Sequence, residues 1–135
     1  MRRTVLIVGL LLLASLATAA EPEKRSVVAA IDADGVQRVE VIGGGYFYDP
    51  YRIQVQVNVP VELTVVKAKG MVPHNIVMRA PEAGIDFDEE MKTAPKIIRF
   101  TPTRAGTYPF YCSKKLLFLE SHQEKGMEGV LEVVE

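Results

Sequence analysis

Short stretches in which apolar and polar residues alternate recur along most of the chain. The clearest is 52–57, Arg-Ile-Gln-Val-Gln-Val, because successive side chains of a strand point to opposite faces of a sheet. Similar or β-branched stretches predict further strands at residues 26–31, 36–42, 61–67, 74–78, 96–100, 106–112 and 129–134. Turn residues separate several of them, such as Asp32-Ala33-Asp34-Gly35 and Asn58-Val59-Pro60.

Two stretches depart from this pattern. Residues 80–95 contain prolines, a glycine and the acidic residues Asp86, Asp88, Glu89 and Glu90, and we expect a loop there with one helical turn. The segment 113–124 has helical character and interrupts the last two strands. The whole pattern predicts an all-β, Greek-key β-sandwich of seven or eight strands, with a short loop or helical insert before the final strand.

The first twenty residues are expected to lie outside this domain. Arg2 and Arg3 precede an apolar run at 5–17, and small residues follow at 17–20. This order is typical of a secretory signal peptide, and the run is shorter than the ~20 residues that span a bilayer. We therefore expect cleavage after residue 20 and one exported domain at 21–135, with an uncleaved membrane anchor as the alternative.

Composition narrows the possible functions. The chain has 135 residues, 48% of them hydrophobic, and a net charge of −1. The hydrophobic content is too high for a disordered chain, and the net charge lacks the basic excess of a protein that binds nucleic acid. A single cysteine cannot form an internal disulfide, and two histidines limit any metal site to few ligands.

The residues suited to bind a metal occur in a suggestive order. His74, Cys112 and His122 include every cysteine and histidine of the chain, and Met127 follows closely. A thiolate, two imidazoles and a weak thioether are the ligands of a mononuclear blue-copper electron-transfer site. Such a ligand mixture suits both Cu(I), which favours sulfur, and Cu(II), which favours nitrogen. We expect His74, Cys112 and His122 to form the trigonal set, with Met127 as a weaker axial ligand.

The segments around these residues resemble the cupredoxin family, in particular plastocyanin, pseudoazurin and amicyanin. Pro73-His74-Asn75 is similar to the family's first-ligand motif, in which the asparagine joins the ligand loops. The segment 106–112 is similar to the strand that delivers the thiolate, and the aromatic segment 46–53 resembles the one that opens the core strands. The resemblance implies a blue-copper fold, a periplasmic location, and a role for Asn75 in holding the ligand loops together around the metal.

One feature differs from the small members of this family. They usually hold two to four residues between the cysteine and the second histidine, whereas nine separate Cys112 from His122 here. Blue-copper domains of copper nitrite reductases have loops of about this length. The insert 113–121 leaves open whether Met127 or a carboxylate, from Glu120 or Glu124, is the axial ligand.

The sequence thus predicts an exported, monomeric copper protein that transfers single electrons between redox partners. The partners are expected to dock near His122 and the apolar residues Leu116–Leu119, unless these residues form a lid over the sandwich. Copper delivery, buffering or resistance is the alternative, and a metal-free interaction module is a weaker one. An enzyme is not expected, because both histidines are already used. Neither nucleic-acid binding nor stable membrane insertion is expected.

Overall fold

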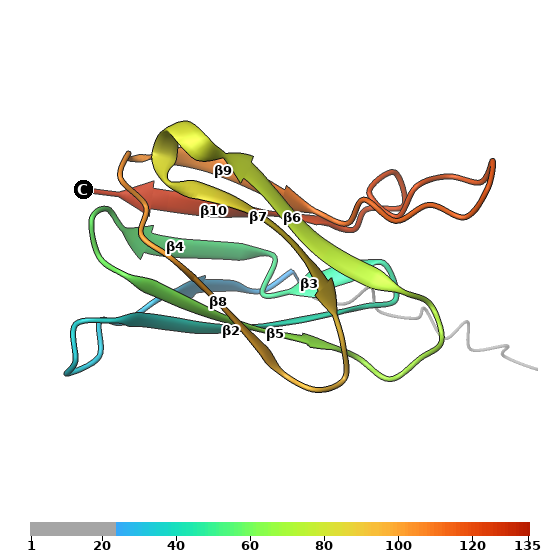
Figure 1. Ribbon diagram of the computed structural model, residues 1–135, viewed down its shortest axis with the longest axis horizontal. Coiled ribbons are helices and arrows are strands. Elements are labelled where there is room, and N and C mark those ends of the chain that lie inside the picture. Colours follow the sequence, from blue (N-terminus) through green and yellow to red (C-terminus); the bar gives the residue numbers. More distant parts are fainter. Residues whose placement is uncertain (1–23) are drawn as a thin grey trace, which may run out of the picture.

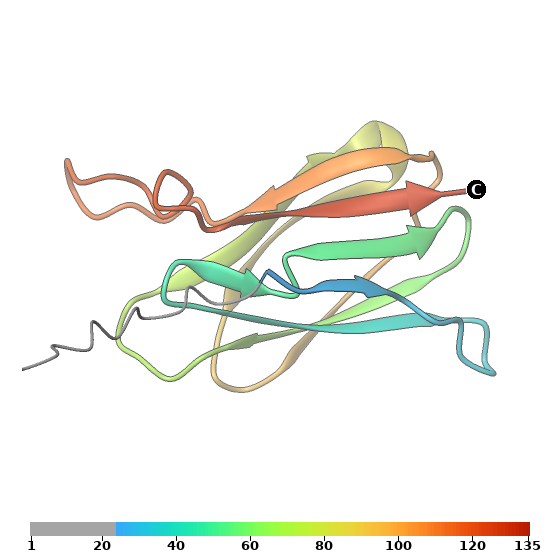
Figure 2. The ribbon, with the colours of Figure 1, turned by 180° about the vertical axis from the view of Figure 1, so that it is seen from behind.

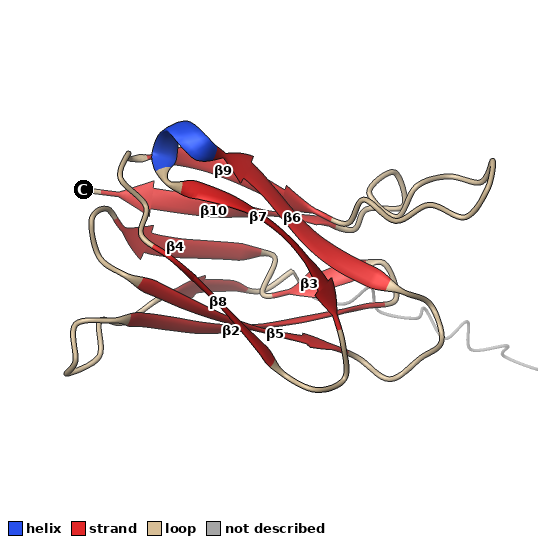
Figure 3. Ribbon diagram, viewed as in Figure 1, coloured by secondary structure: helices blue, strands red, loops and turns tan. Residues whose placement is uncertain are grey.

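A computed structural model describes residues 24–135, which form ten strands and one 3-10 turn (Figure 1). The strands are β1 (Ser26–Val28), β2 (Gln37–Gly44), β3 (Phe47–Asp49), β4 (Arg52–Gln56), β5 (Val61–Lys67), β6 (His74–Ala80), β7 (Ile85–Met91), β8 (Lys96–Phe100), β9 (Gly106–Tyr111) and β10 (Glu128–Val134). The short turn η1 (Pro81–Ala83) links β6 to β7. Strands and loops make up nearly all of the described chain (Figure 3).

The strands form two mixed sheets that pack face to face (Figures 1 and 2). The larger sheet has the order β1-β4-β10-β9-β6-β7, and the smaller has the order β3-β2-β5-β8. β4 runs parallel to β1 and β10, and β2 runs parallel to β5, while the remaining pairs are antiparallel. The all-β sandwich predicted from the alternating pattern is confirmed.

The core lies between the inner faces of the two sheets, where the alternating residues meet. Val39 and Val41 of β2 and Leu63 and Val65 of β5 are buried from one side. From the other sheet, β4 and β10 bury the alternate residues Ile53, Val55, Leu131 and Val133. Burial of these aliphatic side chains is the main stabilising contribution, at about 1.5–3 kcal/mol for each fully buried residue.

The expected loop at 80–95 is wrong at residues 85–91. Residues 85–91 form β7, which pairs with β6 from His74↔Met91 to Ala80↔Ile85. Ile85 and Met91 are buried, while the acidic residues between them are partly or fully exposed, so this is an edge strand with one polar face. The expected helical turn is present as η1, and β3 is a further strand that the sequence pattern did not predict.

The segment 113–124 does not form the helix that its composition suggested. Lys115 and Ser121 form an isolated bridge, and Leu119 N–H donates to the Leu116 carbonyl at 3.0 Å, which closes a tight turn. A single helix-like turn follows, in which Lys125 N–H donates to the Ser121 carbonyl at 3.1 Å. Four consecutive apolar residues cannot be gathered on one face of a short helix, which explains the difference.

The expected signal peptide at 1–20 lies outside the described residues. Within residues 24–135, no helix is long and apolar enough to cross a membrane.

Candidate metal centre

One end of the sandwich collects all four residues proposed from the sequence. His74 begins β6, Cys112 follows the last residue of β9, and Met127 precedes the first residue of β10. Because β9 is antiparallel to both β6 and β10, these three positions lie at the same end of the larger sheet. The loop that joins β9 to β10 carries His122 back to this end, where its N–H donates to the Lys114 carbonyl at 2.9 Å.

Three ligand atoms meet at this end in a small triangle. The Nδ1 atoms of His74 and His122 are 3.2 Å apart, and Cys112 Sγ lies 3.4 Å from His122 Nδ1 and 3.9 Å from His74 Nδ1. Three ligands bound to one first-row metal in a plane, at about 2.0–2.3 Å, would lie about 3.5–3.7 Å from one another. The observed triangle is therefore the right size for a single trigonal metal ion.

The surroundings of the three ligand atoms favour the protonation state in which histidine binds a metal. His74 and His122 are only 3% and 5% exposed, and Cys112 is fully buried. Burial, followed by the neighbouring charge of His122 and that of Lys67, lowers the pKa of His74 to about 4. Burial, together with the charge of Lys125, also lowers the pKa of His122. Both imidazoles are thus neutral near pH 7, as a metal ligand must be.

The donor set discriminates between metals. Two imidazoles and one thiolate in a trigonal arrangement suit copper, because the sulfur stabilises Cu(I) and the nitrogens accept Cu(II). A structural zinc site would usually complete four strong ligands, and no further cysteine or histidine exists in the chain. The residues present therefore fit a copper ion.

Met127 is buried beside this triangle. Its N–H donates to the His122 carbonyl at 2.9 Å, and its carbonyl accepts from Cys112 N–H at 3.1 Å. Its methyl group and the thioether of Met91 approach Gly43 on β2, where a Cβ would lie only 3.2 Å and 2.7 Å from them. A glycine at this position thus leaves space for two methionine side chains under the site.

Asn75 joins three segments around the site. Its side-chain oxygen accepts from Ser113 N–H at 2.9 Å, and its amide nitrogen lies 2.8 Å from both the Ser113 hydroxyl and an Asp88 carboxylate oxygen. Its carbonyl accepts from the Tyr48 hydroxyl at 2.5 Å, and burial raises the pKa of Tyr48, which keeps it a donor. Asn75 therefore ties the residue after Cys112 to β6 and β7.

The two carboxylates considered as axial ligands have other surroundings. Glu124 accepts from Ser121 N–H at 2.6 Å, and its own N–H donates to the Ser121 hydroxyl at 3.2 Å. Hydrogen bonds from the backbone N–H and then the side chain of Ser121 lower the pKa of the Glu124 carboxyl. Glu120 lines a surface groove next to His122. The cluster of potential ligands within the described residues comprises His74, Cys112 and His122.

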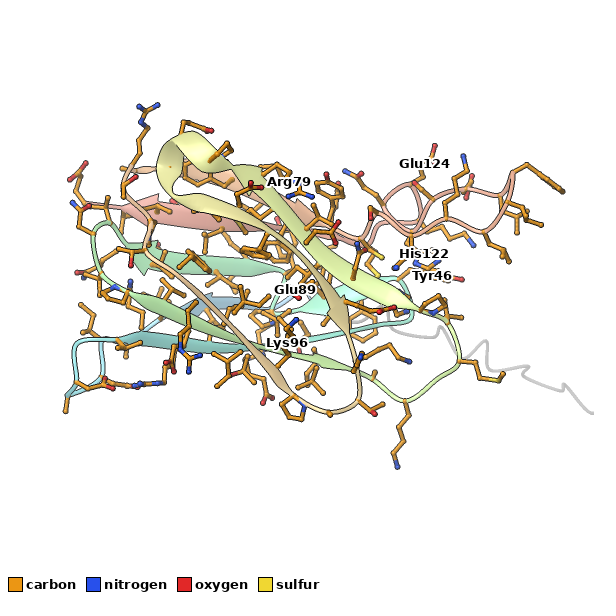
Figure 4. The ribbon with its side chains drawn as sticks, viewed as in Figure 1. Tyr46, Arg79, Glu89, Lys96, His122 and Glu124 are labelled. Atoms are coloured by element: carbon orange, nitrogen blue, oxygen red, sulfur yellow. The ribbon has the colours of Figure 1, made fainter. Side chains whose placement is uncertain are left out.

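Tyr46 is a site residue that the sequence reasoning did not identify. Its ring contacts His122 edge-on, with centroids 5.0 Å apart, and His74 at 6.1 Å. Lys125 lies over the same ring, 4.5 Å from its centroid. Figure 4 shows Tyr46 and His122 next to each other at the metal end of the molecule. In the sequence, the only signal for a special role of Tyr46 was its position after three glycines. In the structure its φ is 64°, a conformation that non-glycine residues rarely adopt.

A groove of about 360 Å³ leads from the surface to this centre. Of the three potential ligands, His122 alone lines it. Its walls come from two loops and from Tyr46, and include Met71, Val72, Pro73, Lys114, Lys115, Leu116, Leu119, Glu120 and Lys125. Leu116 and Leu119 thus lie beside His122, as the sequence predicted for this end of the molecule.

Comparison with known proteins gives structural neighbours only. No family model matches the chain, and no curated protein matches it in sequence. Similar folds occur in the metal-binding domain of the Cu(I)-exporting P-type ATPase of Streptococcus pneumoniae, solved with Cu(I), at 28% identity and a TM-score of 0.62. That comparison covers 84% of this chain and 100% of the other.

Two further solved structures, an auracyanin and an amicyanin, are also similar. A reduced auracyanin of Roseiflexus castenholzii shares 21% identity at a TM-score of 0.59, over 73% of this chain and 97% of the other. A reduced amicyanin mutant shares 25% identity at a TM-score of 0.50, over 76% of this chain and 86% of the other. Their sandwich fold is the one described above. Together with the His-Cys-His cluster, these similarities show that the chain has the cupredoxin fold and a candidate copper site at one end of it.

Proposed function

We propose that this protein binds one copper ion and carries single electrons between redox partners. The observation that carries the proposal is the buried triangle formed by two imidazole Nδ1 atoms and the Cys112 sulfur. In the proposed site, His74, Cys112 and His122 would hold the metal, and the Met127 thioether would be a fourth, weaker ligand. Copper would supply the one-electron chemistry.

Contacts within the surrounding chain support this geometry. His74, Cys112 and Met127 lie at strand ends, and His122 lies in the loop between β9 and β10. Asn75 holds the residue after Cys112 in place through hydrogen bonds to its N–H and hydroxyl. Neutral, buried imidazoles need no proton release before they bind a metal. A site that changes little between Cu(I) and Cu(II) transfers electrons with a small reorganisation cost.

The route for the electron follows from the groove. His122 lines it, while His74 and Cys112 do not, so His122 is the ligand closest to a docked partner. The apolar walls beside it, Leu116 and Leu119, suit a transient contact with a redox protein. We expect the export signal to place this exchange in a periplasm.

Copper delivery is the second candidate function, and two observations favour it. A structural neighbour at 28% identity is the metal-binding domain of a Cu(I)-exporting ATPase. In this chain, Met71 is fully exposed in the wall of the groove that reaches His122. A thioether at the entrance is a suitable ligand for incoming Cu(I).

Electrochemistry and copper exchange separate the two functions. For electron transfer, we expect the copper-loaded domain at residues 21–135 to give a reversible one-electron wave on an electrode and to lose Cu(I) to a competing chelator only slowly. A Met71→Ser variant should then behave as the native protein does. Fast loss of Cu(I), slowed at least several-fold in Met71→Ser, together with an irreversible wave, would favour delivery and contradict electron transfer.

A further inference from the structure

The loop between Cys112 and His122 ends in a closed and exposed turn. Leu119 N–H donates to the Leu116 carbonyl, and the bridge between Lys115 and Ser121 closes the base of the turn. Leu117 adopts a φ of 50°, which is uncommon for a leucine. The turn therefore has a defined backbone conformation. Figure 1 shows this loop extending beyond the ends of the strands, in orange and red.

The exposed tip of this turn is entirely apolar. Leu117 is 79% exposed and Phe118 is 89% exposed, and Leu116 and Leu119 beside them are 63% and 46% exposed. Leu117 and Phe118 do not line the groove at His122, in contrast to Leu116 and Leu119. The tip thus presents a contiguous apolar surface away from the groove, and such a surface usually marks a binding site.

The base of the tip is positively charged. The two loops at this end, residues 68–73 and 113–127, together with the last residue of β5, carry five lysines and two glutamates: Lys67, Lys69, Lys114, Lys115, Lys125, Glu120 and Glu124. Glu90 on β7 lies 3.8 Å from Lys114 and neutralises part of this charge. The whole chain carries a net charge of −1, so the excess of lysine is local to the metal end.

An apolar tip on a loop that carries lysines, next to a second lysine-containing loop, complements an anionic bilayer. The acyl region of a bilayer accepts apolar side chains of any shape, while lysines extend their charged ends to the phosphate layer. A second copy of the chain would bring two sets of lysines together, which is unfavourable. We propose that Leu117 and Phe118 insert into the surface of anionic membranes and attach the metal end of the domain reversibly to them.

This attachment is peripheral and is separate from the copper chemistry. The inserted residues belong to one turn and do not cross the bilayer, and none of them is a proposed metal ligand. The groove at His122 would then lie close to the membrane surface, within reach of a membrane-bound redox partner. Because the attachment does not require metal, the metal-free protein tests it independently of the proposed electron transfer.

The absence of tryptophan from the chain allows a direct test. A Phe118→Trp variant of residues 21–135 contains one tryptophan, at the tip. This length is suitable because both sheets and the core lie within the described residues 24–135. The matched control is Val28→Trp, at a position that is 70% exposed on β1 in the body of the sandwich. Each protein is mixed with vesicles of phosphatidylcholine alone or of phosphatidylcholine with phosphatidylglycerol.

With vesicles that contain phosphatidylglycerol, we expect the tryptophan emission of Phe118→Trp to shift to the blue and to be quenched by brominated acyl chains. The control should show neither effect, and raising the salt concentration should weaken the binding because salt screens the lysines. If the emission does not shift with anionic vesicles, the proposal is overturned, and the tip is better explained as a binding site for a partner protein. Equal shifts with neutral vesicles would overturn the role of the lysines. A shift that depends on protein concentration without lipid would instead show self-association.

Co-sedimentation provides a second measurement without the fluorophore. A Leu117→Ser/Phe118→Ser double variant should lose at least tenfold in binding to the anionic vesicles. Its circular dichroism spectrum should match that of the native domain, because the replaced side chains are exposed. The control Val28→Ser/Ile97→Ser replaces two exposed apolar residues on β1 and β8 and should bind as the native domain does. Undiminished binding of the tip variant would contradict insertion.

Discussion

At the scale of single residues, few positions determine the candidate site, and they differ in how visible they are in the sequence. Cysteine and histidine are rare in this chain, so the spacing of His74, Cys112 and His122 was enough to predict that they come together. Tyr46 was not predictable in the same way. Its contact with both histidines depends on a positive φ and on a fold that brings residues 46 and 122 together.

The first prediction concerns Tyr46. Replacement of its ring in Tyr46→Ala should admit water to His122 and lower the reduction potential of the copper-loaded protein, because a more polar environment favours Cu(II). We expect a decrease of up to about 60 mV, which is a tenfold change in a one-electron equilibrium. Tyr46→Phe keeps the ring and should stay close to the native potential. Equal shifts in the two variants, measured by voltammetry, would show that the hydroxyl group rather than the ring matters.

A second prediction identifies the axial thioether. Met127 and Met91 are both buried and both approach Gly43, but the sequence order favours Met127 as the ligand. Met127→Leu should raise the reduction potential, since Cu(I) tolerates the loss of a fourth ligand better than Cu(II) does, while Met91→Leu serves as the matched control. If Met91→Leu gives the larger shift, the assignment of Met127 is wrong.

At the scale of elements, alternation predicted most of the strands but not β7. Its acidic residues suggested a loop, because Asp86, Asp88, Glu89 and Glu90 are unfavourable in a buried strand. In the structure β7 is an edge strand, and its carboxylates form ion pairs with basic residues of neighbouring strands. Arg79 pairs with Asp86, and Lys96 pairs with Glu89. These partners lie on β6 and β8, and a single strand's sequence does not reveal them.

The turn that carries His122 gives a third prediction. Ser121 and Glu124 exchange hydrogen bonds, each accepting the other's backbone N–H. Ser121→Ala removes one of these bonds and should lower the free energy of unfolding of the metal-free domain by about 1 kcal/mol. The affinity for copper should fall as well, because His122 is less well positioned. Gln123→Ala, in the same turn, is the control, and an equal loss in that variant would contradict the role of the Ser121–Glu124 pair.

At the scale of the whole molecule, the closed sandwich places two ionisable groups where they are stable only when neutral. Burial lowers the pKa of His74 to about 4 and also lowers that of His122. The unfolded chain protonates these histidines near their ordinary pKa of about 6.5. Between these values the unfolded state binds more protons than the folded state, so acid favours unfolding.

The fourth prediction follows from this difference. The free energy of unfolding of the metal-free domain should fall as the pH is lowered from about 6.5 towards 4, by at most about 1.4 kcal/mol per pH unit for each histidine. The carboxyls of Asp34 and Glu62, whose pKa values Arg38 lowers, contribute only at lower pH. Urea unfolding at a series of pH values measures this slope. A His74→Gln variant should show a smaller slope, and an unchanged stability across this range would contradict neutral, buried histidines.

The central claim is that the cysteine and the two histidines hold copper in an electron-transfer geometry. Its most direct test is the visible absorption spectrum of the domain at residues 21–135 after one equivalent of Cu(II) is added, with Cys112→Ser as the control. We expect an intense blue or green band from charge transfer between the thiolate and copper, and its loss in the control. A colourless protein that retains copper only in the reduced state, or one that retains none, would contradict the claim.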